Sequence, residues 1–313
     1  RIDWLQAWRG PASRRPCRHL QAVSGQDRQS EPWMASRVFF QARPRTTVAY
    51  TGFIIGCVYC GRTLETKATG EYDYMLTLSA AMQALAFALL VLDTRSQVAE
   101  GLSEKTLWAF LIAHISRLST TFWGEGYVPE DNTSDVYLYQ LCELIGVCLL
   151  GWKVLHLSTM RTMHDVGQGL ERWSMLAGMC GSALVLAYFT KSTGHNDWFA
   201  DLSWMFSVWL ESFALFPQVM LLDKTSQVDE TAIHFATLTL GASLIFAGFW
   251  SRTAADRYEE FQKLGAHGFL RGIVTAAMIR TLLCVSYFYL FVRSRRTKGR
   301  GGAEYELCSP DEL

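Results

Sequence analysis

Long apolar runs separated by short polar segments dominate the pattern of this chain. An α-helix needs about 20 predominantly apolar residues to cross the hydrocarbon core of a bilayer. Seven runs approach or exceed that length: Tyr74–Leu92, Thr106–Trp123, Asp135–Leu157, Trp173–Thr190, Trp198–Leu222, Thr231–Trp250 and Gly268–Val292. A shorter apolar run, Thr46–Cys60, predicts an additional span near the N-terminus. The pattern therefore predicts an all-α integral membrane protein with seven to eight transmembrane helices.

The same pattern divides the chain into four segments. Residues 1–45 hold nine Arg and only three acidic residues, which predicts a disordered basic segment. Met34 is the first methionine and a candidate start of the translated chain. An extra transmembrane helix is expected at 46–60, a seven-helix membrane domain at 74–293 and a basic cytosolic tail at 294–313.

The positions of Lys and Arg between the spans predict the orientation. Eleven of these cations lie in the segments on one predicted side of the membrane, and four lie on the other. Cytosolic loops carry the excess of Lys and Arg in membrane proteins. The C-terminal tail is therefore expected in the cytosol and the segment 124–134 in the lumen or outside the cell.

A short internal repeat suggests a duplicated architecture. Leu92–Glu100 and Leu222–Glu230 are identical at six of nine positions, at a constant shift of 130 residues. Two such segments on the same predicted side imply a parallel repeat. The simplest arrangement is two three-helix bundles joined by a linker helix (3+1+3); chance similarity between two polar linkers is the alternative.

Several ionisable residues fall inside the predicted spans. An unpaired Arg at the position of Arg280, near the middle of its run, would cost at least about 2.5–3.5 kcal/mol. Arg280 is therefore expected to have an acidic partner, either Glu143 or Glu211. The pair could be structural or functional. His114 could be a packed histidine or a pH sensor, and it shares a helix face with Arg117 three residues later.

No zinc, nucleotide or hydrolase pattern occurs in the sequence. We therefore expect no enzymatic activity, no cofactor, no bound metal and no nucleic-acid partner. The cysteines fall mostly inside apolar runs, so they do not suggest a disulfide framework.

Several motifs resemble the KDEL receptor family, the ER lumen protein-retaining receptors. The clearest is the segment Trp204–Gln218, which is followed by Lys224-Thr225 and looks like the fifth helix of that family. Supporting matches are Gly101–Lys105 leading to Arg117, His234 at the start of the sixth helix, and Tyr287–Phe291 at the end of the seventh. The resemblance covers roughly 74–293. It implies the 3+1+3 fold of the SWEET and PQ-loop proteins, and the extra N-terminal helix resembles a divergent, receptor-related branch.

The resemblance also implies a set of ligand-binding residues. It assigns Arg117 to the ligand carboxylates and Asp201 to the basic first residue of the peptide, with Trp204, Glu211 and Trp250 also retained. Five family positions differ in this chain. Met75 and Met82 replace an arginine and a proposed pH-sensing histidine, Ala242-Ser243 a Tyr-Arg pair, and Ser286 an aspartate. We expect Arg280 to supply the positive charge that Ser243 lacks.

The leading functional hypothesis is a receptor of the ER and Golgi membranes that binds C-terminal retrieval tetrapeptides (KDEL- or HDEL-like). The expected partners are these peptides, the COPI coat through the cytosolic tail, and membrane lipid. The alternatives are a small-solute, sugar-like transporter of the SWEET or PQ-loop type and a receptor-related scaffold that binds nothing. Arg252, Arg257 and Arg271 near the predicted luminal ends favour an anionic ligand over a sugar.

Overall fold

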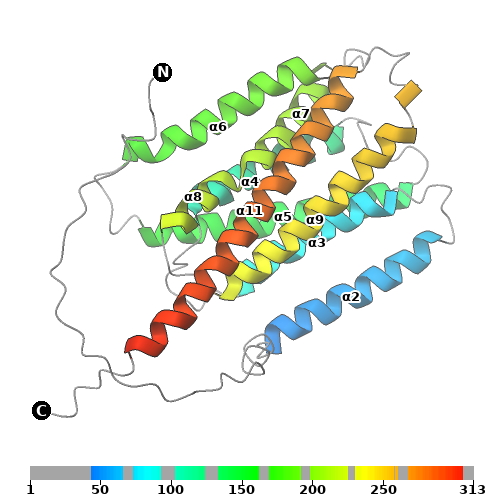
Figure 1. The fold of residues 1–313 in the computed structure, drawn as a ribbon. Helices are drawn as coiled ribbons and strands as arrows, with labels where there is room; N and C mark the ends of the chain where they lie inside the picture. Colours follow the sequence, from blue (N-terminus) through cyan, green and yellow to red (C-terminus); the bar gives the residue numbers. More distant parts are fainter. Residues whose placement is uncertain are drawn as a thin grey trace, which may run out of the picture. The chain divides into compact units, whose positions relative to one another are not determined.

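The computed structural model describes residues 44–65, 73–92, 103–123, 133–161, 169–191, 198–224, 230–256, 258–259 and 267–305. Throughout these residues the regular structure is α-helical (Figure 1). Residues 1–43 of the predicted basic N-terminal segment lie outside the described residues, and so do residues 93–100 and 225–229 of the two repeated segments.

The helices follow the predicted apolar runs closely. Their bounds are α2 (Pro44–Glu65), α3 (Asp73–Leu92), α4 (Glu104–Trp123), α5 (Thr133–Arg161), α6 (Gly169–Thr190), α7 (Trp198–Phe213), α8 (Phe216–Lys224), α9 (Glu230–Asp256) and α11 (His267–Tyr305). Among the described residues, six spans are long and apolar enough to cross a membrane, and they correspond to α3, α5, α6, α7 with α8, α9, and α11. The prediction of an all-α multi-pass membrane protein is confirmed.

Helix α4 is not among those six spans, although its run was predicted to cross the membrane. Its 20 residues include Lys105, His114 and Arg117 together with several hydroxyl side chains, which lower its mean hydropathy. The side chains of His114 and Arg117 are nevertheless buried, at 2% and 4% exposure. Helix α4 is therefore an interior helix whose polar residues face other helices.

The sequence pattern predicted one helix over the run Trp198–Leu222. The structure instead divides this run into two helices. Helix α7 ends at Phe213 and α8 begins at Phe216. Pro217 explains the break, because proline has no N–H to donate and its ring clashes with the carbonyl group four residues earlier. At the break, the N–H of Ala214 donates to the carbonyl oxygen of Glu211 at 3.3 Å.

Helix α11 also extends beyond its predicted end at Val292. It continues to Tyr305 and is 39 residues long. The apolar part that could cross a membrane is Gly268–Arg293. The backbone of the predicted basic tail is thus helical over its first twelve residues.

Contacts between helices support two bundles related by the predicted repeat. In the first bundle α5 packs against α3 and α4, and in the second α11 packs against α7 and α9. Two further contacts, α3 with α9 and α4 with α7, join the bundles. If the repeat relates α3 to α7 and α4 to α9, then the contact between α3 and α9 corresponds to the contact between α7 and α4.

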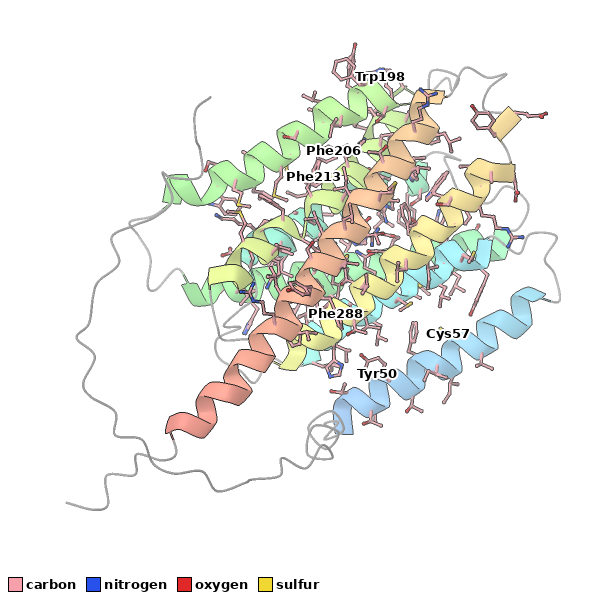
Figure 2. The ribbon with its side chains drawn as sticks, in the orientation of Figure 1. Tyr50, Cys57, Trp198, Phe206, Phe213 and Phe288 are labelled. Atoms are coloured by element: carbon pink, nitrogen blue, oxygen red, sulfur yellow. The ribbon has the colours of Figure 1, made fainter. Side chains whose placement is uncertain are left out.

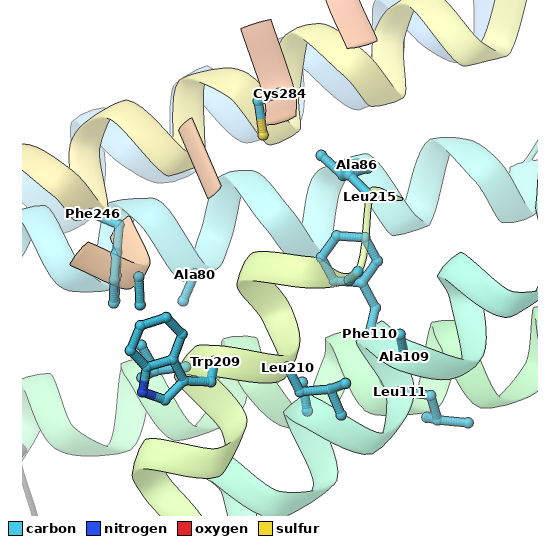
Figure 3. Packing of buried hydrophobic residues seen from close by; sticks show 14 of the residues in the cluster. Ala80, Ala86, Ala109, Phe110, Leu111, Trp209, Leu210, Leu215, Phe246 and Cys284 are labelled. Atoms are coloured by element: carbon cyan, nitrogen blue, oxygen red, sulfur yellow. The ribbon is translucent and has the colours of Figure 1, made fainter. Parts of the chain in front are cut away.

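The buried apolar core lies between these helices. Figure 3 shows part of it, where Trp209, Leu210 and Leu215 lie close to residues of α3, α4 and α9. Large apolar side chains such as Phe189, Leu155 and Leu282 are exposed on the outer faces, as expected where helices meet lipid. Figure 2 shows the side chains distributed over both the inner and the outer faces of the helices.

Candidate functional site

A group of ionisable side chains is buried between the helices of both bundles. It comprises His114 and Arg117 on α4, Glu143 on α5, Glu211 on α7 and Arg280 on α11. Their exposed fractions lie between 1% and 4%. Burial of so many charges is tolerated only where each is paired and hydrogen-bonded. We call these five residues the buried charge network.

Glu211 is the centre of this network because both arginines bind its carboxylate. Arg117 donates through Nη2 to Oε2, and Arg280 Nη2 lies 2.8 Å from Oε1. The amide of Gln83 on α3 bridges the second pair. It donates to Glu211 Oε1 at 2.7 Å and accepts from Arg280 Nη2 at 2.9 Å. Glu211, Gln83 and Arg280 therefore form a closed triangle of two hydrogen bonds and one ion pair between three helices.

The network continues from Arg117 toward α5. Arg117 Nη1 donates to Glu143 Oε1 at 3.2 Å, and its Nε donates to the Ser207 hydroxyl at 3.4 Å. The other oxygen of Glu143 lies 2.5 Å from Nδ1 of His114. The order of contacts is therefore His114, Glu143, Arg117, Glu211, Arg280, in which anions alternate with cationic or basic groups.

The formal charges of the network balance when His114 is neutral, because two arginines face two glutamates. Within the network, two nitrogen atoms have no hydrogen-bond partner among the described residues. They are His114 Nε2 and Arg280 Nε. Buried polar atoms in native proteins usually have partners. These two atoms are therefore the points at which the network could accept another polar group.

Aromatic rings form a cluster next to the network, on α7, α9 and α11. Trp204 packs against Trp250 at 5.6 Å and against Phe269 at 5.8 Å, measured between ring centroids. Phe246 lies beside Trp250 at 6.3 Å, and the Arg280 guanidinium lies over the Phe246 ring at 5.4 Å. A cation over a ring face is attracted to it, so Arg280 links the charge network to this cluster.

Asp201 is buried on α7, one turn before Trp204, with 2% exposure. Helix α7 therefore carries three of the predicted residues in order: the acid Asp201, the aromatic ring of Trp204, and Glu211 at the centre of the network. The sequence predicted all three as ligand-binding residues, and that role stays a prediction.

Of the positions that depart from the KDEL receptor pattern, Met82 and Ala242 lie where α3 packs against α9. The methyl group of Met82 would be 2.5 Å from a Cβ added at Gly241, so the two helices approach closely there. Ser79 donates to the Ala242 carbonyl oxygen at 2.8 Å, and Ser243 donates to the Thr239 carbonyl oxygen at 2.7 Å. Ser79 thus connects α3 to α9, whereas the hydrogen bond of Ser243 to Thr239 lies within α9, and none of these side chains is charged.

The structure brings four of the predicted residues together: His114, Arg117, Glu211 and Arg280. It also selects between the two partners expected for Arg280, because Glu211 contacts Arg280 while Glu143 contacts His114 and Arg117. Sequence reasoning missed Gln83. A large amide inside the apolar run of α3 was the signal that could have identified it.

Comparison with known proteins identifies the family. The family described as ER lumen protein retaining receptor matches residues 98–252, which reach from the segment before α4 to α9. ER lumen protein-retaining receptor 3 of Mus musculus is 24% identical over 224 residues, covering 71% of this chain and 91% of the relative. The ER lumen protein-retaining receptor of Saccharomyces cerevisiae is 28% identical over 209 residues, covering 64% and 84%. The chain belongs to this receptor family.

Membership of the ER lumen protein-retaining receptor family has two consequences. The chain is a multi-pass membrane protein of the ER and Golgi, consistent with its apolar helices. The family is a receptor family and not an enzyme family. The match of 98–252 includes Arg117, Glu143 and Glu211, whereas α2 and Arg280 lie outside it.

Proposed function

We propose that this chain is a retrieval receptor that binds the C-terminal tetrapeptide of escaped ER luminal proteins and returns them from the Golgi to the ER. The observation that carries the proposal is the pair of buried arginines, Arg117 and Arg280, that share Glu211. Guanidinium groups bind carboxylates with two parallel hydrogen bonds. A peptide with a free C-terminus and acidic side chains offers carboxylates that can replace Glu211 on these arginines.

The spacing of charges along α7 fits a short extended peptide. Asp201 and Glu211 are ten residues apart, which corresponds to about 15 Å along a helix axis. Four extended residues span about 13 Å. A tetrapeptide could therefore place its basic first residue near Asp201 and its acidic end near the arginines, with Trp204 and Trp250 beside its middle.

The exchange has an electrostatic cost, because a carboxylate displaces another carboxylate inside a low-dielectric site. The two unpartnered atoms of the network, Arg280 Nε and His114 Nε2, offer further contacts to the incoming group. Hydrogen bonds to charged groups contribute about 1.5–3 kcal/mol each. Contacts of this size can offset the loss of a Glu211 contact. The COPI coat remains the proposed partner of the cytosolic tail, and membrane lipid the proposed surroundings of the spans.

Binding of a labelled HDEL-type peptide to the purified protein tests the proposal, at mildly acidic and at neutral pH. The informative variant is Arg117→Lys, which keeps a positive charge between Glu143 and Glu211 but removes the planar fork. We expect it to fold like the wild type and to bind roughly ten- to hundredfold more weakly, as for a lost charge-assisted contact of about 1.5–3 kcal/mol. The matched control is Arg293→Lys, an exposed position at the end of the apolar part of α11.

A peptide with an amidated C-terminus provides a second control, because it lacks the terminal carboxylate. Equal binding of the free and amidated peptides, or of the wild type and Arg117→Lys, would show that the site does not read carboxylates. Sugar uptake into proteoliposomes without peptide binding would instead support the transporter alternative.

A further inference from the structure

Helix α2, which lies outside the family match, makes specific contacts with both bundles. It packs against α3. The hydroxyl of Tyr50 lies 3.0 Å from Nδ1 of His234 at the start of α9, and the two ring centroids are 5.6 Å apart. Tyr74 at the start of α3 donates to the carbonyl oxygen of Cys57 at 3.4 Å. In Figure 2 Tyr50 and Cys57 lie on the side of α2 that faces the other helices.

Helix α6 makes the corresponding contacts with the other pair of helices. It packs against α7, and also against α4 and α11. Near the first turns of α4 and α6, the rings of Trp108 and Trp173 meet with centroids 5.8 Å apart. An aromatic contact near the first turns of two helices therefore joins α6 to α4, as Tyr50 and His234 join α2 to α9. Figure 1 shows α2 and α6 on opposite sides of the remaining helices.

The positions of the helices in the sequence agree with this correspondence. The loop repeat has a shift of 130 residues. Adding this shift to the first residues of α2, α3, α4 and α5 gives positions 174, 203, 234 and 263. Helices α6, α7, α9 and α11 begin at Gly169, Trp198, Glu230 and His267, each within five residues of those positions.

We propose that α2 is the first helix of a four-helix repeating unit and acts as a clamp across the contact between α3 and α9. The chain is then a tandem repeat of two four-helix units, α2 to α5 and α6 to α11, rather than two three-helix units and a linker. Helix α6 spans the α4–α7 contact, and α2 spans the α3–α9 contact. The two contacts that join the halves are thus each covered by one additional helix.

The clamp bears on the buried charge network, because that network joins the same two halves. Gln83 and Arg117 belong to the first half, whereas Glu211 and Arg280 belong to the second. In proteins built from repeated bundles, large conformational changes are often movements of one repeat against the other. Helix α2 restrains such a movement at α3–α9, at a site separate from the network. The clamp does not depend on the identity of the ligand.

Photo-crosslinking in the full chain tests this arrangement. A photo-crosslinking amino acid in place of Tyr50 should give an intramolecular crosslink to α9 or α3, identified by mass spectrometry of the cleaved protein. The same amino acid in place of Val48, which is 71% exposed, should give no such crosslink. A crosslink from position 50 only to a second copy, or none at all, would overturn the proposal.

Two further measurements, made without a crosslinker, complete the test. A protease site inserted at 66–72 allows α2 to be cut from the rest, and we expect the cut α2 to co-elute with 73–313 in mild detergent. Tyr50→Phe removes the hydroxyl that contacts His234 and should lower the melting temperature. Tyr289→Phe, at a 63% exposed tyrosine, should leave it unchanged. Separate elution of α2, or equal melting temperatures for wild type and Tyr50→Phe, would contradict a clamp.

Discussion

Replacing Arg280 tests whether the buried charge network is balanced as its contacts indicate. In Arg280→Gln the side chain stays polar, but two buried glutamates then face Arg117 alone. Breaking a buried ion pair by removing one partner costs about 3–5 kcal/mol, because the survivor remains charged in a low-dielectric interior. At 1.4 kcal/mol for each factor of ten, the folding equilibrium should fall by roughly two to three and a half powers of ten.

The matching change on the other side is Glu211→Gln, which leaves Arg117 and Arg280 with Glu143 as the single anion. It should be at least as costly as Arg280→Gln, because Glu211 contacts both arginines. The double variant restores the balance of one cation and one anion. We therefore expect it to be more stable than either single variant, with a favourable coupling energy in the double-mutant cycle.

Thermal unfolding of the detergent-purified variants, followed by fluorescence-detected size-exclusion chromatography, measures the effect. Arg271→Gln is the matched control, since Arg271 is exposed on the same helix nine residues earlier. Its melting temperature should equal that of the wild type. If Arg280→Gln melts with the control, or if the double variant is no more stable than the singles, the charge-balance reasoning is wrong.

Three further predictions rest on other contacts. Gln83→Leu removes the amide that bridges Arg280 and Glu211, and should lower the melting temperature by the loss of two buried hydrogen bonds of about 1–3 kcal/mol each. Gly272→Ala should lower the free energy of unfolding by about 1–3 kcal/mol, because its Cβ would lie 2.6 Å from that of Thr190. Gly248→Ala serves as control, because a Cβ at Gly248 meets nothing within 4 Å. Tags placed at the C-terminus and within 124–132 should be digested from opposite sides in a protease-protection assay, and protection of both together would refute the predicted orientation.

The sequence predicted the helices well because the bilayer imposes a length and a composition on each span. The predicted run Tyr74–Leu92 coincides with the apolar span of α3. The break between α7 and α8 could also have been predicted, since Pro217 lies within the run and proline interrupts a helix interior. A criterion based on mean hydropathy alone does not identify α4 as a span. The run Thr106–Trp123 was predicted as a helix because few polar residues interrupt it.

The candidate site was predicted less completely, because contacts between helices depend on how each helix is rotated. The cost of an unpaired Arg280 required an acidic partner, but spacing could not choose between Glu143 and Glu211. The choice depends on the rotation of α5 and α7 about their axes, which determines that Glu143 faces α4 and Glu211 faces α11. Gln83 was missed for a related reason, because a neutral amide carries no charge that must be paired.

The order in which the network residues are synthesised has a consequence for how the protein assembles. Arg117 precedes Glu143 by 26 residues and Glu211 by 94, and Gln83 precedes Arg280 by 197. Helix α4 therefore precedes both of its glutamates in the order of synthesis, and it is not among the six spans that are long and apolar enough to cross a membrane. Its stable placement depends on helices that emerge later, so truncation before α7 should leave a chain that cellular quality control removes.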